Sequence, residues 1–298
     1  MNAVMTLDQL RIFVAVAECE HVTRASKALS LTQSAVSATI STLEQRHGVH
    51  LFHRVGRGIE LTDTGRAFIV EARAVLARAE EAQRMLDDAA GLEQGRLSLV
   101  ASQTIAGYWL PPVVACFKAR YPGIVIDLSI GNSAQAADWV RDGTAELGFV
   151  ESPLDDPALA RWQVGEDRLV LIGTSPPAAP DATTLRSMPW LMREEGSGTR
   201  AALEAALRDR GVAMDELNVV LKLPSNEALL SAAASGAGVT VLSTLVAGPL
   251  IAAGVIVAAS FDIPPRPFFG LRHKERYRSK AADALVQLIE SSASLSIR

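Results

Sequence analysis

The sharpest chemical signature in the C-terminal half of the chain is a short run of glycines and hydroxyls, Gly196-Ser197-Gly198-Thr199-Arg200, which follows an apolar segment and opens a helical pattern. Glycines let the backbone turn so that several N–H groups point the same way, and Ser197 and Thr199 add hydroxyl donors. A helix N-terminus attracts negative charge through its dipole and its free N–H groups. The run therefore predicts a site for a small anion, with a plain helix cap as the alternative.

Polar residues also follow several other predicted strands in this half of the chain. Ligands of open α/β sheets bind at the carboxyl ends of the strands, so we expect these residues to converge on one site. Arg193 and Arg200 are further candidates, although ion pairing with Glu194 and Glu195 is the commoner fate of such charges. The candidate ligand-binding residues are Ser102, Gln103, Thr104, Asn132, Ser133, Glu151, Ser197, Gly198, Thr199 and Asn226.

No catalytic set is predicted. The five histidines have no metal-ligand spacing, no serine lies in a nucleophile-elbow motif, and the glycine run lacks the lysine of a nucleotide-binding phosphate loop. We therefore expect no catalytic residue, no metal and no cofactor. An enzyme with a regulatory helical cap would need site residues that the sequence does not offer.

A second candidate site lies near the N-terminus, on a predicted helix that begins after Thr32. Val36, Ile40 and Leu43 recur at spacings of four and three and form its buried side. The opposite side is small, uncharged and rich in hydroxyls, which suits a helix that enters the DNA major groove. A helical hairpin that only packs in a bundle is the alternative. The candidate DNA-reading residues are Thr32, Gln33, Ser34, Ser37, Ala38 and Ser41.

Two short strands around a Gly/Arg turn follow this helix, over residues 51–54 and 59–62. They resemble the wing of a winged helix, and Arg54 and Arg57 would contact phosphates. From His21 to Gly58 the net charge is +4, whereas the whole chain carries −4. A basic segment in an acidic protein is the electrostatic footprint of nucleic-acid contact.

The elements that must position these sites fall into two parts, as 298 residues allow. Thr6 and Thr62 are predicted helix caps, and the helix after Thr62 runs to about Ala90. Mostly small residues at spacings of four and three along this helix predict a dimerisation seam, with packing of the helix on its own domain as the alternative. After residues 91–95, read as a hinge, short β-rich runs alternate with helices, which indicates an α/β architecture with mostly parallel sheets. The seam residues are Phe68, Ala72, Val75, Ala79, Ala82, Leu86 and Ala89.

Cys19 and Cys116 have no metal spacing and are read as reduced thiols of a cytoplasmic protein. We identify no secretory signal and no apolar run of transmembrane length, so no membrane partner is expected.

Residues 7–65 resemble the DNA-binding domain of LysR-type transcriptional regulators. Ser34 and Ala38 depart from the commonest form of the motif, which leaves the preferred bases unassigned. The matching residues are Leu10-Arg11-Ile12-Phe13, Thr23-Arg24-Ala25-Ser26, Leu29, Thr32-Gln33-Ser34-Ala35-Val36-Ser37, Ile40, Leu43-Glu44, Gly48-Val49, Leu51-Phe52-His53-Arg54 and Leu61-Thr62-Asp63-Thr64-Gly65.

The resemblance implies a winged helix-turn-helix over residues 1–65, a linker helix over 62–90 that dimerises, and an effector-binding domain over 91–298. That domain would have two Rossmann-like lobes similar to periplasmic binding proteins. Lobe I would comprise about 95–164 and 267–292, and lobe II about 165–266. The chain would leave lobe I near Gly165 and return near Pro267.

The function implied is that of a transcriptional regulator controlled by a small effector, with promoter DNA, RNA polymerase and a homodimeric or homotetrameric assembly as partners. The run 196–200 also resembles that of LysR-type regulators of sulfur assimilation and carbon fixation. Sulfite, sulfate-like anions or a small phosphorylated or carboxylated metabolite are therefore the expected effectors. The alternative is a cytosolic small-molecule-binding protein whose N-terminal helices only dimerise.

Overall fold

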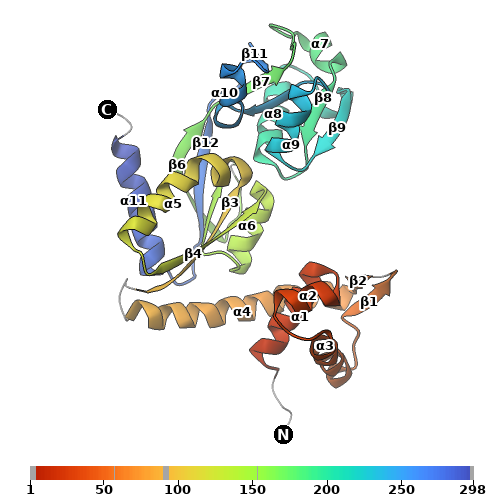
Figure 1. Ribbon diagram of the computed structural model, residues 1–298, viewed down its shortest axis with the longest axis vertical. Helices are drawn as coiled ribbons and strands as arrows, with labels where there is room; N and C mark the ends of the chain where they lie inside the picture. The colour runs from red at the N-terminus through yellow and green to blue at the C-terminus, as the bar shows by residue number, and fades with distance from the viewer. Residues whose placement is uncertain (1–4, 57, 90–93, 153, 296–298) are drawn as a thin grey trace. The chain divides into compact units, whose positions relative to one another are not determined.

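The structure is a computed structural model that describes residues 5–56, 58–89, 94–152 and 154–295 (Figure 1). Its chain divides into two compact units, the first of which ends at Leu86 along the helix that follows the wing. Wing residue Arg57 and most of the predicted hinge, residues 91–93, lie outside the described residues. Within the described parts, no helix is long and apolar enough to cross a membrane. Cys19 and Cys116 are free, as predicted.

The first unit is a winged helix-turn-helix. Thr6 forms a capping box at the start of its first helix, and Thr32 caps the helix that begins at Gln33 by accepting from the N–H of Ala35. Phe13 packs at the centre, with ring centroids 5.4 Å from Phe52 and 4.8 Å from Phe68. The elements are α1 (Leu7–Cys19), α2 (Val22–Ala28), α3 (Gln33–His47), β1 (Phe52–Val55), β2 (Gly58–Leu61) and α4 (Asp63–Ala89).

Helix α4 begins after Thr62, whose hydroxyl accepts from the N–H of Gly65 as the predicted cap requires. Its predicted seam divides into two halves. Phe68 and Ala72 pack into the core of the winged helix, whereas Val75 and Leu86 are 47% and 69% exposed. Large apolar side chains on one exposed stretch of helix are what a dimerisation surface requires.

The second unit has two lobes. Lobe I is a five-stranded sheet of order β4-β3-β5-β12-β6. Helices α5 and α11 cover one face, where Leu110, Phe117 and Leu285 pack on the strands, and α6 covers the other face. The elements of lobe I are β3 (Gly95–Ser102), a π-helix (Ile105–Trp109), α5 (Leu110–Arg120), β4 (Ile124–Gly131), α6 (Ser133–Asp142), β5 (Leu147–Val150), β6 (Leu159–Asp167), β12 (Arg266–His273) and α11 (Lys280–Leu295).

Lobe II comprises the residues between Asp167 and Arg266. An antiparallel sheet of order β10-β7-β11 and a parallel pair, β8-β9, build two apolar clusters with the surrounding helices. Figure 1 shows β6 and β12 as the two strands that run from lobe I toward lobe II. The elements of lobe II are β7 (Leu169–Gly173), α7 (Ala182–Ser187), β8 (Trp190–Arg193), α8 (Gly198–Arg208), a 3-10 helix (Met214–Glu216), β9 (Val219–Leu223), α9 (Asn226–Ala234), β10 (Thr240–Ser243), α10 (Thr244–Ala252) and β11 (Val257–Ala259).

The sheets correct one expectation about strand direction. The sequence predicted mostly parallel sheets, but β12 pairs antiparallel with both β5 and β6, and β7 pairs antiparallel with both neighbours. The antiparallel direction of β12 follows from its return to the lobe I sheet beside β6, the strand on which the chain leaves. The strand β6 itself was absent from the predicted strands. Polar residues and a glycine interrupt the alternation of apolar and polar residues along β6. The sequence therefore lacks the two-residue period by which a strand is predicted.

Candidate functional site

The exposed face of α3 carries the six residues predicted to read DNA, and all six are solvent-exposed. Val36, Ile40 and Leu43 are buried on the opposite side, as their spacing predicted. The hydroxyl of Thr23 donates to Oε1 of Gln33 at 3.1 Å. This contact uses one lone pair of the Gln33 amide oxygen, and the NH₂ group remains available as a donor.

The wing is the antiparallel pair β1–β2, in which Arg54 pairs with Ile59 and its side chain is exposed. His53 and Glu60 face each other across the pair at 3.6 Å, with both side chains about half exposed. The wing therefore presents Arg54 to solvent on the same unit as the uncharged face of α3.

A small cavity of about 10 Å³ lies between the two lobes. A volume of about this size holds one water molecule, so a larger ligand needs the walls of the cavity to move apart. Eight of the ten predicted ligand residues line it, and Arg193 joins them. Thr104 and Asn226 do not line it, but lie buried behind it, where Asn226 Nδ2 donates to Thr104 Oγ1 at 3.0 Å. The lining residues are Ser102, Gln103, Asn132, Ser133, Glu151, Arg193, Ser197, Gly198 and Thr199.

The N-terminus of α8 forms one wall of the cavity. Ser197 is the N-cap and accepts from the N–H of Arg200 at 3.4 Å. Gly196 has a φ of +83°, a left-handed conformation that disfavours any other residue. A Cβ on Gly198 would lie 2.9 Å from Ser133 Oγ and 3.0 Å from Glu151 Oε2. Both glycines are therefore needed to bring this helix end so close to lobe I.

The side chain of Ser102 is an independent indication that the cavity binds a ligand. It ends β3, is 2% exposed, and its Oγ has no hydrogen-bond partner among the described residues. Buried hydroxyls are almost always hydrogen-bonded, because burying a polar group unpaired costs about 1–3 kcal/mol. Its position on the cavity wall makes a bound ligand the natural acceptor.

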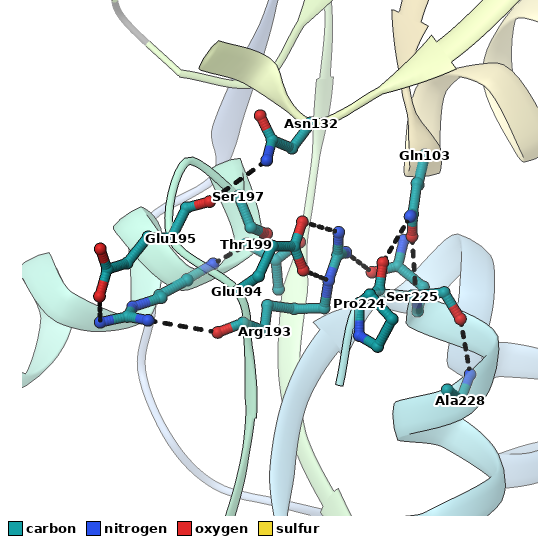
Figure 2. Close-up of polar contacts among 12 residues, drawn as sticks. Gln103, Asn132, Arg193, Glu194, Glu195, Ser197, Thr199, Pro224, Ser225 and Ala228 are labelled. Carbon is teal, nitrogen blue, oxygen red and sulfur yellow. Dashed lines mark hydrogen bonds and ion pairs between the residues drawn. The ribbon is translucent and has the colours of Figure 1, made fainter. Parts of the chain in front are cut away.

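Several hydrogen bonds connect the lobes around the cavity, and three of them involve the side chains of Gln103 and Asn132 (Figure 2). Gln103 Nε2 donates to the carbonyl of Pro224 at 2.8 Å, and its Oε1 accepts from the N–H of Asn226 at 3.0 Å. Asn132 Nδ2 donates to the carbonyl of Glu195 at 3.2 Å. The Gln103 amide, predicted to bind ligand, thus has both of its polar ends engaged across the lobes.

Tyr108 adds an apolar contact between the lobes by packing on the lobe II core from the π-helix that follows Thr104. Its burial, and secondarily the Glu227 carboxylate, raise the pKa of the Tyr108 phenol above its ordinary value. The phenol therefore stays neutral at physiological pH.

The two arginines near the glycine run pair with acids of the protein, the commoner of the two fates considered. Arg193, buried on β8, forms a two-pronged pair with Glu194 at 2.8 Å for each contact and also donates to Asn226 Oδ1. Arg200 donates to Glu204 at 2.8 Å, and its guanidinium lies 3.6 Å from Glu195. These partners neutralise both guanidinium groups.

Sequence reasoning missed a buried group that adjoins the cavity. Arg266 donates to Thr199 Oγ1 at 3.1 Å and to Asp167 Oδ2 at 2.5 Å, and lies 3.9 Å from Glu151. Neither Arg266 nor Asp167 belongs to a motif, and they meet only because the two connecting strands pair. A charged residue at the end of an apolar strand was the one available signal, and it is a weak one.

Comparison with known proteins places both units in one family. Residues 7–66 match the bacterial regulatory helix-turn-helix proteins of the lysR family, and residues 90–294 match the LysR substrate binding domain. The uncharacterized transcriptional regulator YeiE of Escherichia coli K12 is 33% identical over 283 residues, covering 93% of this chain and 94% of that protein.

Two further proteins are similar to this chain, and the first is a regulator of a RuBisCO operon, in line with the resemblance to carbon-fixation regulators. The RuBisCO operon transcriptional regulator of Allochromatium vinosum is 31% identical over 246 residues, which is 80% of each chain. The regulatory domain of CcmR from Synechocystis PCC6803, solved in complex with 2-PG, has a TM-score of 0.61 and 27% identity, covering 67% of this chain and 97% of that one. With both of its units matched, the chain belongs to the LysR family of transcriptional regulators and joins a DNA-binding helix-turn-helix domain to a two-lobed effector-binding domain.

Proposed function

We propose that this regulator responds to a small anion bound in the cavity between lobes I and II. The observation that carries the proposal is the buried hydroxyl of Ser102, which has no partner among the described residues and lines the same small cavity as the N-terminus of α8. The first N–H groups of a helix have no acceptor within it, and its dipole favours negative charge. Ser197 and Thr199 add hydroxyls to the same wall.

The charges around the cavity narrow the class of anion. Arg193 is neutralised by Glu194, and the acidic group on the wall is Glu151, 4% exposed. One oxygen of Glu151 accepts from Ser133 at 3.0 Å, and the carboxylate is an acceptor only. An effector should therefore offer acceptor oxygens to the hydroxyls and one O–H or N–H to Glu151. Hydrogen sulfite, hydrogen phosphate and a small phosphate monoester meet this requirement better than sulfate.

We also propose how the DNA-binding unit is used. Gln33, Ser37 and the other exposed residues of α3 would contact base edges, while Arg54 of the wing would contact phosphates. The exposed second half of α4 would pair with a second copy of the chain, giving a homodimer or a homotetramer that reads a two-fold symmetric promoter site. Effector binding would change the arrangement of the DNA-binding pairs, and with it the contact with RNA polymerase in the cytoplasm.

A thermal-shift experiment on the intact protein tests the anion proposal. Sulfite, sulfate, inorganic phosphate and 2-PG are each titrated against wild type and the Ser197→Ala/Thr199→Ala variant. We expect a saturable rise in Tm with at least one protonated anion, and loss of that rise in the variant. An equal rise in the variant, or no rise with any of the four anions, would refute an anion site at α8.

A further inference from the structure

Arg266 lies at the point where the two connecting strands meet the effector cavity. It is the first residue of β12 and pairs in register with Asp167, the last residue of β6. The residue is 5% exposed, and the register of these strands shifts at Phe268, two residues further on. The guanidinium is thus buried at the junction through which lobe II is joined to lobe I.

The contacts of this guanidinium reach both lobes. Nη1 donates to Thr199 at the start of α8 in lobe II, while Nη2 donates to Asp167 and lies 3.9 Å from Glu151 at the end of β5 in lobe I. The second oxygen of Asp167 accepts from Ser243 Oγ at 2.9 Å, and Ser243 caps α10. One side chain thereby connects two strands and two helix N-termini.

A contribution to folding stability does not by itself explain why Arg266 is buried with Asp167 and Glu151. The side chains of Arg266, Asp167 and Glu151 are 4%, 0% and 3% exposed, so one buried cation serves two buried carboxylates. Replacing a buried ion pair with apolar residues is often neutral or stabilising, because desolvation offsets the Coulombic gain. The Nε of Arg266 also lacks a hydrogen-bond partner among the described residues.

The hydrogen bond to Thr199 has a directional consequence. A guanidinium can only donate, so the Thr199 hydroxyl must be the acceptor, with its own proton turned away from Arg266. Within the described residues, Thr199 Oγ1 makes no other hydrogen bond, and Thr199 lines the cavity. The proton of this hydroxyl therefore has the cavity as its natural direction.

We propose that Arg266 is a positioning residue of the effector site, a role that rests on the proposed function of the cavity. Its hydrogen bond to Thr199 orients the Thr199 hydroxyl as a donor to the bound anion. Its hydrogen bond to Asp167 connects that hydroxyl to the two strands that join the lobes. Arg266 does not line the cavity and acts through Thr199. Effector contact at α8 is thereby linked mechanically to the junction of the lobes.

The test is a double-mutant cycle on the full-length protein, with sulfite and inorganic phosphate as probes in calorimetric titrations. Arg266→Lys keeps a positive charge beside Asp167 but loses the planar fork that serves two acceptors. We expect about 10-fold weaker binding of the probe, as for the loss of one hydrogen bond to a charged group. Thr199→Ser should retain binding, and Thr199→Val should weaken it by about the same 10-fold factor as Arg266→Lys.

Coupling between the two positions decides between positioning and a general structural role. If Arg266 acts through Thr199, Arg266→Lys should cause little further loss in the Thr199→Val background. Independent, additive losses would overturn the proposal. Arg272→Lys is the matched control, since Arg272 lies on the same strand and donates only to the carbonyl of His273 in its one described hydrogen bond, at 3.5 Å.

A second measurement needs no effector. Amide hydrogen exchange of the free protein should accelerate in the first turn of α8 and at Ser243–Leu245 in Arg266→Lys, but not in Arg272→Lys. Unchanged exchange at both places would refute the positioning role even if both probes bind. If neither probe binds wild type, the anion proposal loses these two candidates, while the exchange result still decides the role of Arg266.

Discussion

Gly198→Ala places one methyl group at the boundary between the lobes and provides a sharp test of the cavity. The added Cβ would lie 2.9 Å from Ser133 Oγ and 3.0 Å from both Cβ and Oε2 of Glu151. Contacts this short must be relieved by moving Ser133 and Glu151, or α8 itself. The backbone of Gly198 does not have a positive φ, so alanine is conformationally acceptable and the effect is one of space.

Two opposing effects determine how much Gly198→Ala changes the free energy of unfolding. Overpacking by one methyl group typically costs about 1–3 kcal/mol, whereas Gly→Ala within a helix gains about 0.5–1 kcal/mol. We therefore expect the free energy of unfolding to fall by about 1–2 kcal/mol, measured by urea denaturation followed by circular dichroism. Because the methyl group also displaces the walls of a small cavity, anion affinity should fall by more than about 10-fold, or 1.4 kcal/mol.

Gly248→Ala is the matched control. Gly248 lies inside α10, and a Cβ there would meet nothing within 4 Å. This variant should gain about 0.5–1 kcal/mol of stability and bind the anion as wild type does. If Gly198→Ala were as stable as Gly248→Ala, or bound sulfite or phosphate with wild-type affinity, the close approach of α8 to lobe I would be refuted.

Three further predictions concern DNA binding and assembly. Gln33→Ala should cost about 1–3 kcal/mol on promoter DNA and much less on unrelated DNA, measured by fluorescence anisotropy; equal losses would show that α3 does not read bases. Arg54→Ala should weaken binding to both DNAs and lower the slope of log affinity against log salt by about 1, and an unchanged slope would exclude a phosphate contact. Leu86→Lys, on the exposed half of α4, should dissociate the assembly in sedimentation velocity, and an unchanged sedimentation coefficient would place the dimer interface elsewhere.

The parts of the fold that the sequence predicted are those whose signal is local. The starts of three helices could be predicted from Thr6, Thr32 and Thr62. An N-cap side chain accepts a hydrogen bond from a backbone N–H only two or three residues further along the chain. The run 196–200 likewise predicts the N-terminus of a helix, because its cap residue and its glycines act within the run itself. Eight of the ten predicted ligand residues line one cavity, because strand ends in an α/β sheet converge whatever the details of packing.

The parts that the sequence did not predict depend on pairing between distant positions. Arg266 and Asp167 are 99 residues apart, and Gln103 and Asn226 are 123 apart, so no window along the chain contains either pair. Gln103 was expected to bind ligand, yet its amide is consumed by a contact that exists only once the lobes meet. Local chemistry identified the polar residues, whereas the tertiary structure decides which of them keep a free donor.

The side-chain donors around the cavity differ in whether they already have a partner, and this difference indicates how an anion can act on the effector-binding domain. The amides of Gln103 and Asn132 connect the lobes through backbone groups of lobe II, so these contacts can form before any ligand arrives. The hydroxyl of Ser102 in lobe I is buried without a partner, while Thr199 in lobe II is held by Arg266. An anion that accepts from both hydroxyls at once would favour the arrangement in which they face each other. Its preference for that arrangement is the differential affinity that any ligand-driven change requires.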